Sequence, residues 1–363
     1  MGRTQRVGRG VLAALLAPGL VAQEPMEMGP IPTREMFPLY LPTLAYQPVD
    51  PTPVGQGRWR VALDTIRANT FEFSDVFKTQ APRDAQGRVT LTREFVLAHA
   101  ADYAAVPVIF FFDEEISRTT LRVRYGLTSN TDLWAELPFQ SHGGGYLDNV
   151  IEGFHSLGFE QFGRDRIAKN RLTLVVMTRG NLDFYSDQTI RGKTQDSLLG
   201  VVHRFLESPT WSLSAQFTLK PPTTTTYDIY RSGWDHSLGV TGRWQPAPRH
   251  VFYFGGAYVG RPPGSTPYNQ LAFGGMRNGW GAHGTWEYRR WPRFRPFLQL
   301  YAQSGYLKPQ LYQKLDRGSL QHDLGFHWPI WKNATLTFRY LNNITHNENT
   351  ADMGLGLSLT AAF

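Results

Sequence analysis

The chain has no cysteine, no lysine-rich run and, beyond its first residues, no apolar stretch that approaches the length of a membrane helix. Without cysteine there is no disulfide framework, so strand pairing and packing must supply the stability. Nucleic-acid binding is disfavoured despite a sequence pI of about 9.5, because the arginines are spread along the chain. A helical membrane protein is excluded, since each span needs about 20 mostly apolar residues.

The first 22 residues have the pattern of a secretory signal peptide. Arg3, Arg6 and Arg9 form a basic start, and a short apolar stretch interrupted by Pro18 follows and ends at Ala22. That stretch is too short for a spanning helix. We therefore predict export and leave residues 1–22 out of the fold; their removal lowers the formal charge from +7 to about +4.

The C-terminal stretch from Met353 to Phe363 alternates strictly between two kinds of side chain. One parity carries methionine, leucine, alanine and phenylalanine, and the other carries glycine, serine, threonine and alanine. Such alternation predicts a strand with one apolar face. A strand that ends on an aromatic carboxy terminus resembles the closing strand of bacterial outer-membrane barrels. The resemblance implies that the barrel-assembly machinery recognises Phe363.

The same alternation recurs throughout residues 57–363 and predicts a barrel there. The expected strands cover 58–65, 106–127, 132–139, 196–206, 211–220, 234–244, 250–260, 272–289, 298–303, 320–328, 335–340 and 353–363. Their connections alternate between short and long, as periplasmic turns and extracellular loops do. We therefore predict an all-β fold: a transmembrane up-and-down antiparallel β-barrel of about twelve strands, with a short helix in a long extracellular loop.

Aromatic residues favour this membrane barrel over a soluble β-sandwich, whose strands would also alternate. Six of them lie at strand ends beside the short connections: Trp211, Trp244, Tyr288, Trp291, Trp328 and Trp331. Such aromatic girdles mark the membrane interfaces of barrels. Strands in lipid must also close on themselves, because an open edge would leave backbone groups unpaired.

Three stretches interrupt the strand pattern. Residues 23–56 carry eight prolines and cannot form a central strand, so they are either a loose periplasmic arm or a plug that enters the barrel. Residues 76–104 are expected to be a polar loop. Residues 141–194 are expected to be a long extracellular loop, with a helix over 146–158 and with a hairpin arm or an extra strand over 171–186.

Four motifs lie close together in the region 116–166. They are Arg124-Tyr125-Gly126-Leu127-Thr128, the stretch 133–139, His142-Gly143-Gly144-Gly145 with 151–155, and Gly163-Arg164-Asp165-Arg166. Together they resemble a family of Gram-negative outer-membrane proteins known only as a conserved domain of unknown function. The resemblance extends over the mature chain and implies a barrel in the outer membrane. It supplies no known catalytic or ligand residues.

Charged residues of the predicted strands should face the lumen, because a charge facing lipid at the midplane costs roughly 2–4 kcal/mol. The pore-lining candidates are Arg60, Arg118, Arg122, Arg124, Asp132, Glu136, Arg204, Asp235, Arg243, Glu287, Arg289, Asp323 and Arg339. Two interpretations are open. These side chains form an ion-pair network that fills a narrow barrel, or they line a pore for anionic or polar solutes.

The long loop contains a second group of candidates, Glu152, His155, Arg164 and Arg166. Glu152 and His155 are three residues apart on the expected helix and therefore lie on one face. Two ligands do not make a metal site, so we expect no metal and interpret the pair as part of a hydrogen-bonded loop. The glycines before the helix lack the strand-to-helix phosphate fingerprint, and we expect no cofactor.

No motif supports an enzyme. Asp235, His236 and Ser237 cannot form a triad, because neighbours on a strand point to opposite faces. A barrel lipase is a less favoured alternative. A barrel phospholipase would need a His-x-Ser pair on a lipid-facing strand, and the sequence has none; the nearest pair, His283 and Thr285, is expected to face inward.

The sequence thus predicts a protein of the cell outer membrane that contacts membrane lipids and lipopolysaccharide and binds no nucleic acid. The preferred function is a narrow channel or transporter for small polar or anionic solutes, which the inward arginines favour. The alternative is a non-conducting structural or surface-binding barrel that acts through its loops or through lipopolysaccharide. The balance of arginines against carboxylates and the proline-rich stretch favour this alternative.

Overall fold

The computed structural model describes residues 26–156, 158, 166–224, 233–262, 276–307, 315–345 and 350–363. The predicted signal peptide, residues 1–22, lies outside the described residues. No helix in the described ranges is long and apolar enough to cross a membrane. Strands dominate these ranges and belong to a single sheet.

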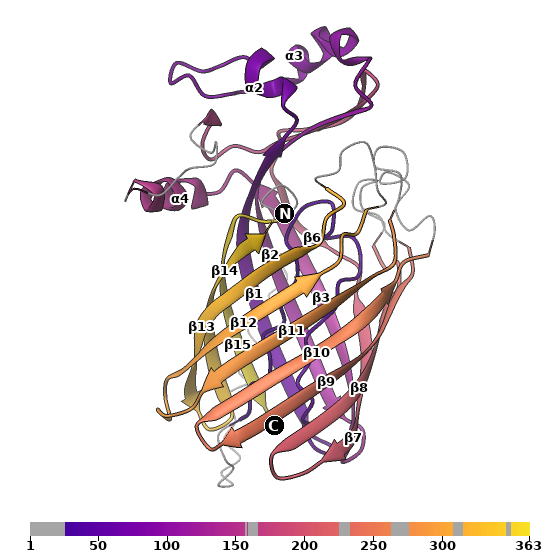
Figure 1. Cartoon of the computed structure of the whole chain (residues 1–363), viewed down its shortest axis with the longest axis vertical. Helices are drawn as coiled ribbons and strands as arrows, with labels where there is room; N and C mark the ends of the chain where they lie inside the picture. Colours follow the sequence, from indigo (N-terminus) through magenta and orange to yellow (C-terminus); the bar gives the residue numbers. More distant parts are fainter. Residues whose placement is uncertain are drawn as a thin grey trace, which may run out of the picture.

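Twelve strands of the described residues form a closed antiparallel barrel, which confirms the predicted fold class (Figure 1). Each strand pairs with its neighbours around the ring, and β2 with β3 completes the circuit. The strands are β1 (Trp59–Phe73), β2 (Val108–Gly126), β3 (Thr131–Gly143), β7 (Leu198–Glu207), β8 (Trp211–Lys220), β9 (Asp235–Ala247), β10 (His250–Gly260), β11 (Gly279–Tyr288), β12 (Arg295–Gln303), β13 (Ser319–Trp331), β14 (Ala334–Thr345) and β15 (Met353–Ala362).

The first and last strands of the barrel, β1 and β15, pair with each other. Their register runs from Arg60 opposite Ala362 to Asn69 opposite Met353. Backbone hydrogen bonds join Trp59 and Phe363 in both directions. The alternating C-terminal stretch is therefore the closing strand, and the described wall keeps no open edge that lipid would leave unsatisfied.

Side chains alternate between the two faces of the wall. On β8, Ser214 and Gln216 are buried, whereas Trp211 and Phe217 are exposed. The enclosed face is polar and the exposed face is apolar, which is the pattern of a barrel in lipid and the inverse of a soluble β-sandwich.

Aromatic residues form two exposed belts on the barrel. The six predicted residues lie beside the short turns, where Trp211 and Trp244 stack with ring centroids 5.5 Å apart. A second belt, which the sequence reading did not identify, lies at the other strand ends and includes Trp234, Tyr258 and Trp280. Two belts match the two interfaces of a membrane.

Beyond the barrel, the upper parts of β1 and β2 rise into an extension at the end opposite the short turns (Figure 1). There β2 pairs with β4 (Thr173–Thr178), which pairs with β5 (Asn181–Ser186), so residues 171–186 contain a hairpin. Short β6 (Ile190–Thr194) pairs with β3. Helix α4 (Leu147–His155) confirms the helix expected in the long loop.

The expectation of a polar loop over residues 76–104 is wrong. This stretch contains helices α2 (Val76–Gln80) and α3 (Arg93–Ala98) and a 3-10 turn, Ala100–Tyr103. Their apolar side chains cover one face of the extension in a buried cluster that includes Phe77, Val96, Phe111 and Val175. Helices of five or six residues are too short to show a clear helical period in the sequence.

Candidate functional site

Residues 26–56, which we call the interior segment, lie inside the barrel. The segment contains no helix or strand, and residues 29–51 are buried apart from Pro32, which is partly buried. Polar side chains of the wall bind its backbone groups, which the many prolines leave without a ladder of their own. The enclosed space is therefore a filled lumen whose filling belongs to this chain.

The ascending limb of the interior segment runs from the short-turn end towards the extension. Gln299 of β12 accepts a hydrogen bond from the Ile31 amide (2.8 Å) and donates to the Ile31 carbonyl (2.9 Å). Its amide also donates to Thr33 (2.9 Å). Further along, the Glu35 carboxylate accepts from the Ala351 amide (2.9 Å), close to the start of β15.

A turn at residues 37–43 reverses the interior segment. Arg34 stabilises this turn, because its guanidinium donates to the backbone carbonyls of Leu41 (3.0 Å) and Thr43 (3.1 Å). The Thr43 hydroxyl donates to the carbonyl of Tyr40 (2.8 Å). The turn is thus held from within the segment.

The turn also packs against an apolar cluster under the extension, which we call the tip cluster. Phe37 meets Phe112 of β2 edge-on, with ring centroids 5.8 Å apart. The rings of Tyr40 and Tyr306 pack with their centroids 4.6 Å apart, and the Tyr40 hydroxyl donates a hydrogen bond to the Leu315 carbonyl (2.6 Å). The buried members of the tip cluster are Phe37, Leu39, Tyr40, Ala45, Phe110, Phe112, Leu172, Leu174, Val176, Met276, Tyr306, Leu307 and Leu315.

The descending limb returns to the short-turn end through a row of hydrogen bonds to the wall. In chain order, the bonded pairs are Leu44 N with Asp235, Tyr46 O with Tyr301, Gln47 O with Gln216, Val49 O with Thr241, Pro51 O with Ser214 and Val54 N with Asp132. Tyr46 also bonds through its hydroxyl to His283 (2.9 Å). Gly57 then bonds to Gly126 beside a short turn.

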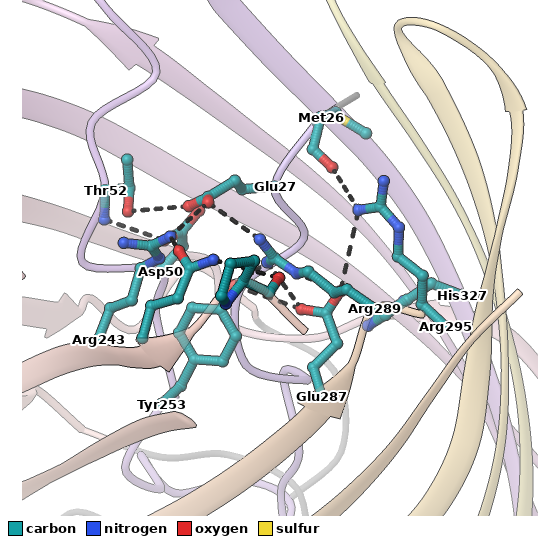
Figure 2. Close-up of polar contacts among 12 residues, drawn as sticks. Met26, Glu27, Asp50, Thr52, Arg243, Tyr253, Glu287, Arg289, Arg295 and His327 are labelled. Atoms are coloured by element: carbon teal, nitrogen blue, oxygen red, sulfur yellow. Dashed lines mark hydrogen bonds and ion pairs between the residues drawn. The ribbon is translucent and has the colours of Figure 1, made fainter. Parts of the chain in front are cut away.

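Charged groups hold the start of the interior segment at the short-turn end (Figure 2). Glu27 accepts hydrogen bonds from Arg243 (2.9 Å) and Arg289 (3.1 Å). Arg289 also contacts Glu287 (2.9 Å) and donates to the Tyr253 hydroxyl (2.7 Å). One carboxylate of the segment therefore bridges two arginines of the wall.

Most of the predicted pore-lining residues do face the interior, where they pair with one another or with the interior segment. Ion pairs join Arg60 with Asp50 (2.8 Å), Arg122 with Glu136, Arg124 with Asp132 (2.6 Å) and Arg339 with Asp64 (2.7 Å). Asp235 lies 3.4 Å from Lys220, and Asp323 accepts from Thr33. These ion pairs are those of the lumen while the interior segment fills it. They therefore fit both an ion-pair network that fills the barrel and the lining of a pore that the segment closes.

Two predicted arginines differ from the rest. Arg204 lies at the short-turn rim, where it pairs with Glu207 (2.6 Å) and donates to the Asn130 side chain (2.8 Å). Arg118 is buried, and it donates a long hydrogen bond of 3.4 Å to the Gln140 side chain. Arg118 thus lies in the wall without a carboxylate partner among the described residues.

A cavity of about 110 Å³ remains between the interior segment and the wall. Both limbs of the segment line it, together with side chains from β1, β2, β3, β13, β14 and β15. Its arginines are Arg34, Arg60, Arg118, Arg122, Arg124 and Arg339, and its carboxylates are Asp50, Asp64 and Glu136. Apolar side chains such as Ile31, Met36 and Trp134 complete the lining, so its charged part is predominantly positive.

Three of the loop candidates, Glu152, His155 and Arg166, belong to the extension and lie away from the lumen. Glu152 of α4 pairs with Arg88 (2.6 Å) and with Lys169. Partial burial raises the pKa of the Glu152 carboxyl, but hydrogen bonds from the two cations outweigh it, and the net pKa is lowered. Arg166 is exposed, and Arg164 lies outside the described residues.

His155 is the last residue of α4, and no group of three or more potential metal-ligating side chains occurs in the described part of the chain. The partners of Glu152 are the two cations from neighbouring loops. Glu152 thus joins α4 to these loops, and the part predicted for His155 in such a contact stays a prediction.

Sequence reasoning missed the residues of the interior segment that contact the wall. Glu27, Arg34 and Asp50 are charged residues in a proline-rich stretch, a pattern that is equally common in solvated arms. Asp50 and Glu27 have their partners 10 and 262 positions away in sequence, at Arg60 and Arg289. One feature of the sequence could have indicated these contacts: the wall has more inward arginines than carboxylates.

Comparison with solved structures shows the fold. A crystal structure of the COG4313 outer membrane channel from Pseudomonas putida F1 has a TM-score of 0.54 at 12% identity and covers 88% of this chain and 100% of that chain. The NanC porin has a TM-score of 0.41 at 9% identity, covering 83% of this chain and 98% of that chain. The comparison with curated proteins gave no match.

A family model matches residues 86–363, which include the motifs around Tyr125 and α4 and all but the first strand of the barrel. The match covers well over half of the chain. It confirms the resemblance drawn from those motifs to an uncharacterised family of barrel proteins. The chain belongs to the family described as Protein of unknown function (DUF3187).

Proposed function

We propose that the protein is an outer-membrane channel for small polar or anionic solutes, which the interior segment closes in the conformation described. The observation that carries the proposal is the path of residues 26–56, which fill the lumen without contributing a strand to the wall. Wall and filling are thus separate parts of the molecule. A twelve-strand wall without the segment would enclose a polar, arginine-rich bore.

The contacts between the interior segment and the wall support a segment that can leave the lumen. Most hydrogen bonds between the descending limb and the wall are single bonds from side chains to backbone carbonyls, such as Thr241 to Val49 (2.8 Å). Leu44, Tyr46 and Val49 of this limb also pack against apolar side chains of the wall. Water can replace such bonds at little net cost, because each contributes only about 1 kcal/mol. Both limbs also end at the same mouth, beside Arg289 and Gly126.

Placement in the outer membrane is part of the proposal. The two aromatic belts and the apolar outer face support it, since both are features of barrels that cross that membrane. One solved structure with this fold is described as an outer membrane channel. The exposed outer face, with residues such as Leu357 and Phe217, would contact membrane lipids and lipopolysaccharide.

Single-channel conductance in planar bilayers tests the proposal. The mature chain is compared with a variant that lacks residues 23–56. We expect rare or brief openings of the full chain and stable, anion-preferring steps of the truncated variant, because removal of the segment exposes the inward arginines.

A matched control uses the natural absence of cysteine. Cysteines placed at Pro51 and Ser214, whose hydrogen bond is 2.7 Å long, tether the descending limb to β8 when oxidised. We expect the oxidised variant to stay closed and the reduced variant to behave like the wild type. Silence of the truncated, correctly folded barrel would rule out the channel.

The tip cluster favours a second candidate function, a barrel that never conducts. Phe37, Leu39 and Tyr40 are almost fully enclosed by apolar side chains of the extension, which is the packing of a permanent core. In that case the extension is the surface that binds other molecules, and the barrel anchors it in the membrane. The conductance experiment separates the two functions, since a permanent core predicts silence even after reduction of the tether.

A further inference from the structure

We propose that the cavity between the interior segment and the wall is a binding site for one small oxyanion, such as phosphate or sulfate, held by Arg34 and Arg118. Arg34 comes from the ascending limb and Arg118 comes from β2, and both line the cavity. The ligand would therefore bridge the interior segment and the barrel. The site deepens the proposed function, but its occupancy does not require that the barrel conducts.

The ion pairs of the cavity leave these two arginines without a carboxylate. Arg60, Arg122, Arg124 and Arg339 each pair with an aspartate or glutamate, as described above. No carboxylate of the described residues forms an ion pair with Arg34 or Arg118. The cavity lining thus contains two positive groups that no carboxylate of the described ranges neutralises within ion-pair distance.

Arg34 is buried, with 9% of its surface exposed. One of its terminal nitrogens donates to the carbonyls of the turn, and its buried Nε has no hydrogen-bond partner among the described residues. A buried guanidinium carries five donors and is always charged. The contacts of Arg34 satisfy only part of this capacity, and a donor of the group remains available.

Arg118 is more deeply buried, with 4% of its surface exposed. The hydrogen bond that it forms within the described part of the chain, to Gln140 at 3.4 Å, is at the limit of a real interaction. Arg34 and Arg122 repel its charge, while Glu136 and Asp64 attract it from beyond ion-pair distance. Burial of a charge without a close counter-ion is strongly unfavourable, so an anionic ligand would stabilise this arrangement.

The size and chemistry of the cavity define the ligand class. A volume of about 110 Å³ is far below the roughly 300–1,000 Å³ of sites for drug-sized ligands, so a small ion fits and an oligosaccharide does not. Guanidinium groups bind phosphate, sulfate and carboxylate oxygens through paired, charge-assisted hydrogen bonds. Asp50, Asp64 and Glu136 are already paired with arginines, which reduces their repulsion of an anion.

Titration calorimetry of the folded full chain in detergent, with inorganic phosphate added to a chloride buffer of equal ionic strength, tests the site. We expect one saturable phosphate site per chain. Arg118→Gln and Arg34→Gln should each weaken the binding tenfold or more. Arg204→Gln removes an arginine of the rim outside the cavity and should leave the binding unchanged.

Folding of each variant is checked by heat-modifiable migration in gels. Arg34 lies outside the wall, so Arg34→Gln keeps the proposal testable even if Arg118→Gln fails to fold. Absence of saturable binding to the wild type overturns the proposal, and so does binding that survives in both folded variants. Phosphate binding to a protein whose truncated form is silent would support the site while refuting the channel, so the two failures are distinguishable.

Discussion

The two ends of the interior segment are held in opposite ways. At the short-turn end, Glu27 meets Arg243 and Arg289 in a partly exposed ionic contact. At the far end, Phe37 and Tyr40 are enclosed among the apolar side chains of the tip cluster. The charged groups next to this cluster are buried guanidinium groups: Arg34 donates to the turn, and Arg261 lies 3.9 Å from the centre of the Tyr306 ring. One end therefore depends on electrostatics that salt can screen, and the other depends on apolar burial that salt leaves intact.

This difference assigns separate roles to the two ends. Apolar burial of a large aromatic side chain contributes several kcal/mol, whereas a partly exposed ion pair contributes about 1 kcal/mol or less. The tip should therefore decide whether the segment stays in the barrel. The ionic end should set how often its first residues fray.

The largest effect is expected from Phe37→Ala, which removes a ring from the tip cluster. Truncation of a buried phenylalanine costs about 3–5 kcal/mol, so the tip should open at least a hundredfold more often. Labelling of a reporter cysteine, Leu39→Cys, by a maleimide measures this opening. Phe154→Ala changes an exposed phenylalanine of α4 and serves as control; equal labelling rates in both variants would contradict the role of the tip.

A smaller effect is expected from Asp50→Asn, which leaves Arg60 in the wall without its carboxylate. Loss of one partner of a buried pair costs about 3 kcal/mol, and the descending limb should loosen accordingly. Labelling of Val49→Cys reports on that limb.

The double variant Asp50→Asn/Arg60→Gln tests whether the charge is the cause. The double variant should recover part of the stability that the descending limb loses in Asp50→Asn, because no uncompensated charge then remains. Asp183→Asn, at an exposed position of β5, is the control. A double variant that is no better than the single one would show that packing, not charge, dominates this contact.

Glu27→Gln should have an effect of about 1 kcal/mol on the ionic end. Labelling of Met28→Cys should rise several-fold at low salt, and the difference from the wild type should vanish near 1 M salt, where the screening length is about 3 Å. The Leu39→Cys reporter at the tip should not respond to salt. Salt sensitivity at both reporters would remove the distinction between the two ends.

The smallest effect is expected outside the barrel, where Glu152 holds α4 between Arg88 and Lys169. Its folded pKa is lowered, so this contact contributes fully above the ordinary value of 4.5 and is lost as the pH falls through the lowered pKa. Hydrogen exchange of residues 147–155, corrected for intrinsic rates, should show protection that declines only below about pH 4.5. Glu152→Gln should remove this dependence.

The wall could be predicted because its environment is periodic. Because lipid covers one face of the wall and the polar filling covers the other, successive residues must alternate between apolar and polar. β8 alternates in this way between the exposed and the buried face along its full length. The sequence also indicated which arginines face inward. The number of strands, the closing strand pair and the aromatic belt beside the short turns all follow from this one pattern.

The interior segment and the extension could not be predicted in the same way. Residues 108–112 of β2 are apolar in every position, because the tip cluster covers one face and the helices cover the other. Such a run fits a buried strand or a short helix equally well. The segment has no period at all, and its site residues, such as Arg34, acquire their role only from distant strands.

The return of the interior segment to its own point of entry has a topological consequence. Glu27 and Gly57 both lie at the short-turn mouth, so residues between them form an open loop that passes through no ring of the chain. Such a loop can enter a barrel whose seam between β1 and β15 is already closed. It can also leave without breaking a single strand pair, so filling and emptying of the lumen are separable from assembly of the wall.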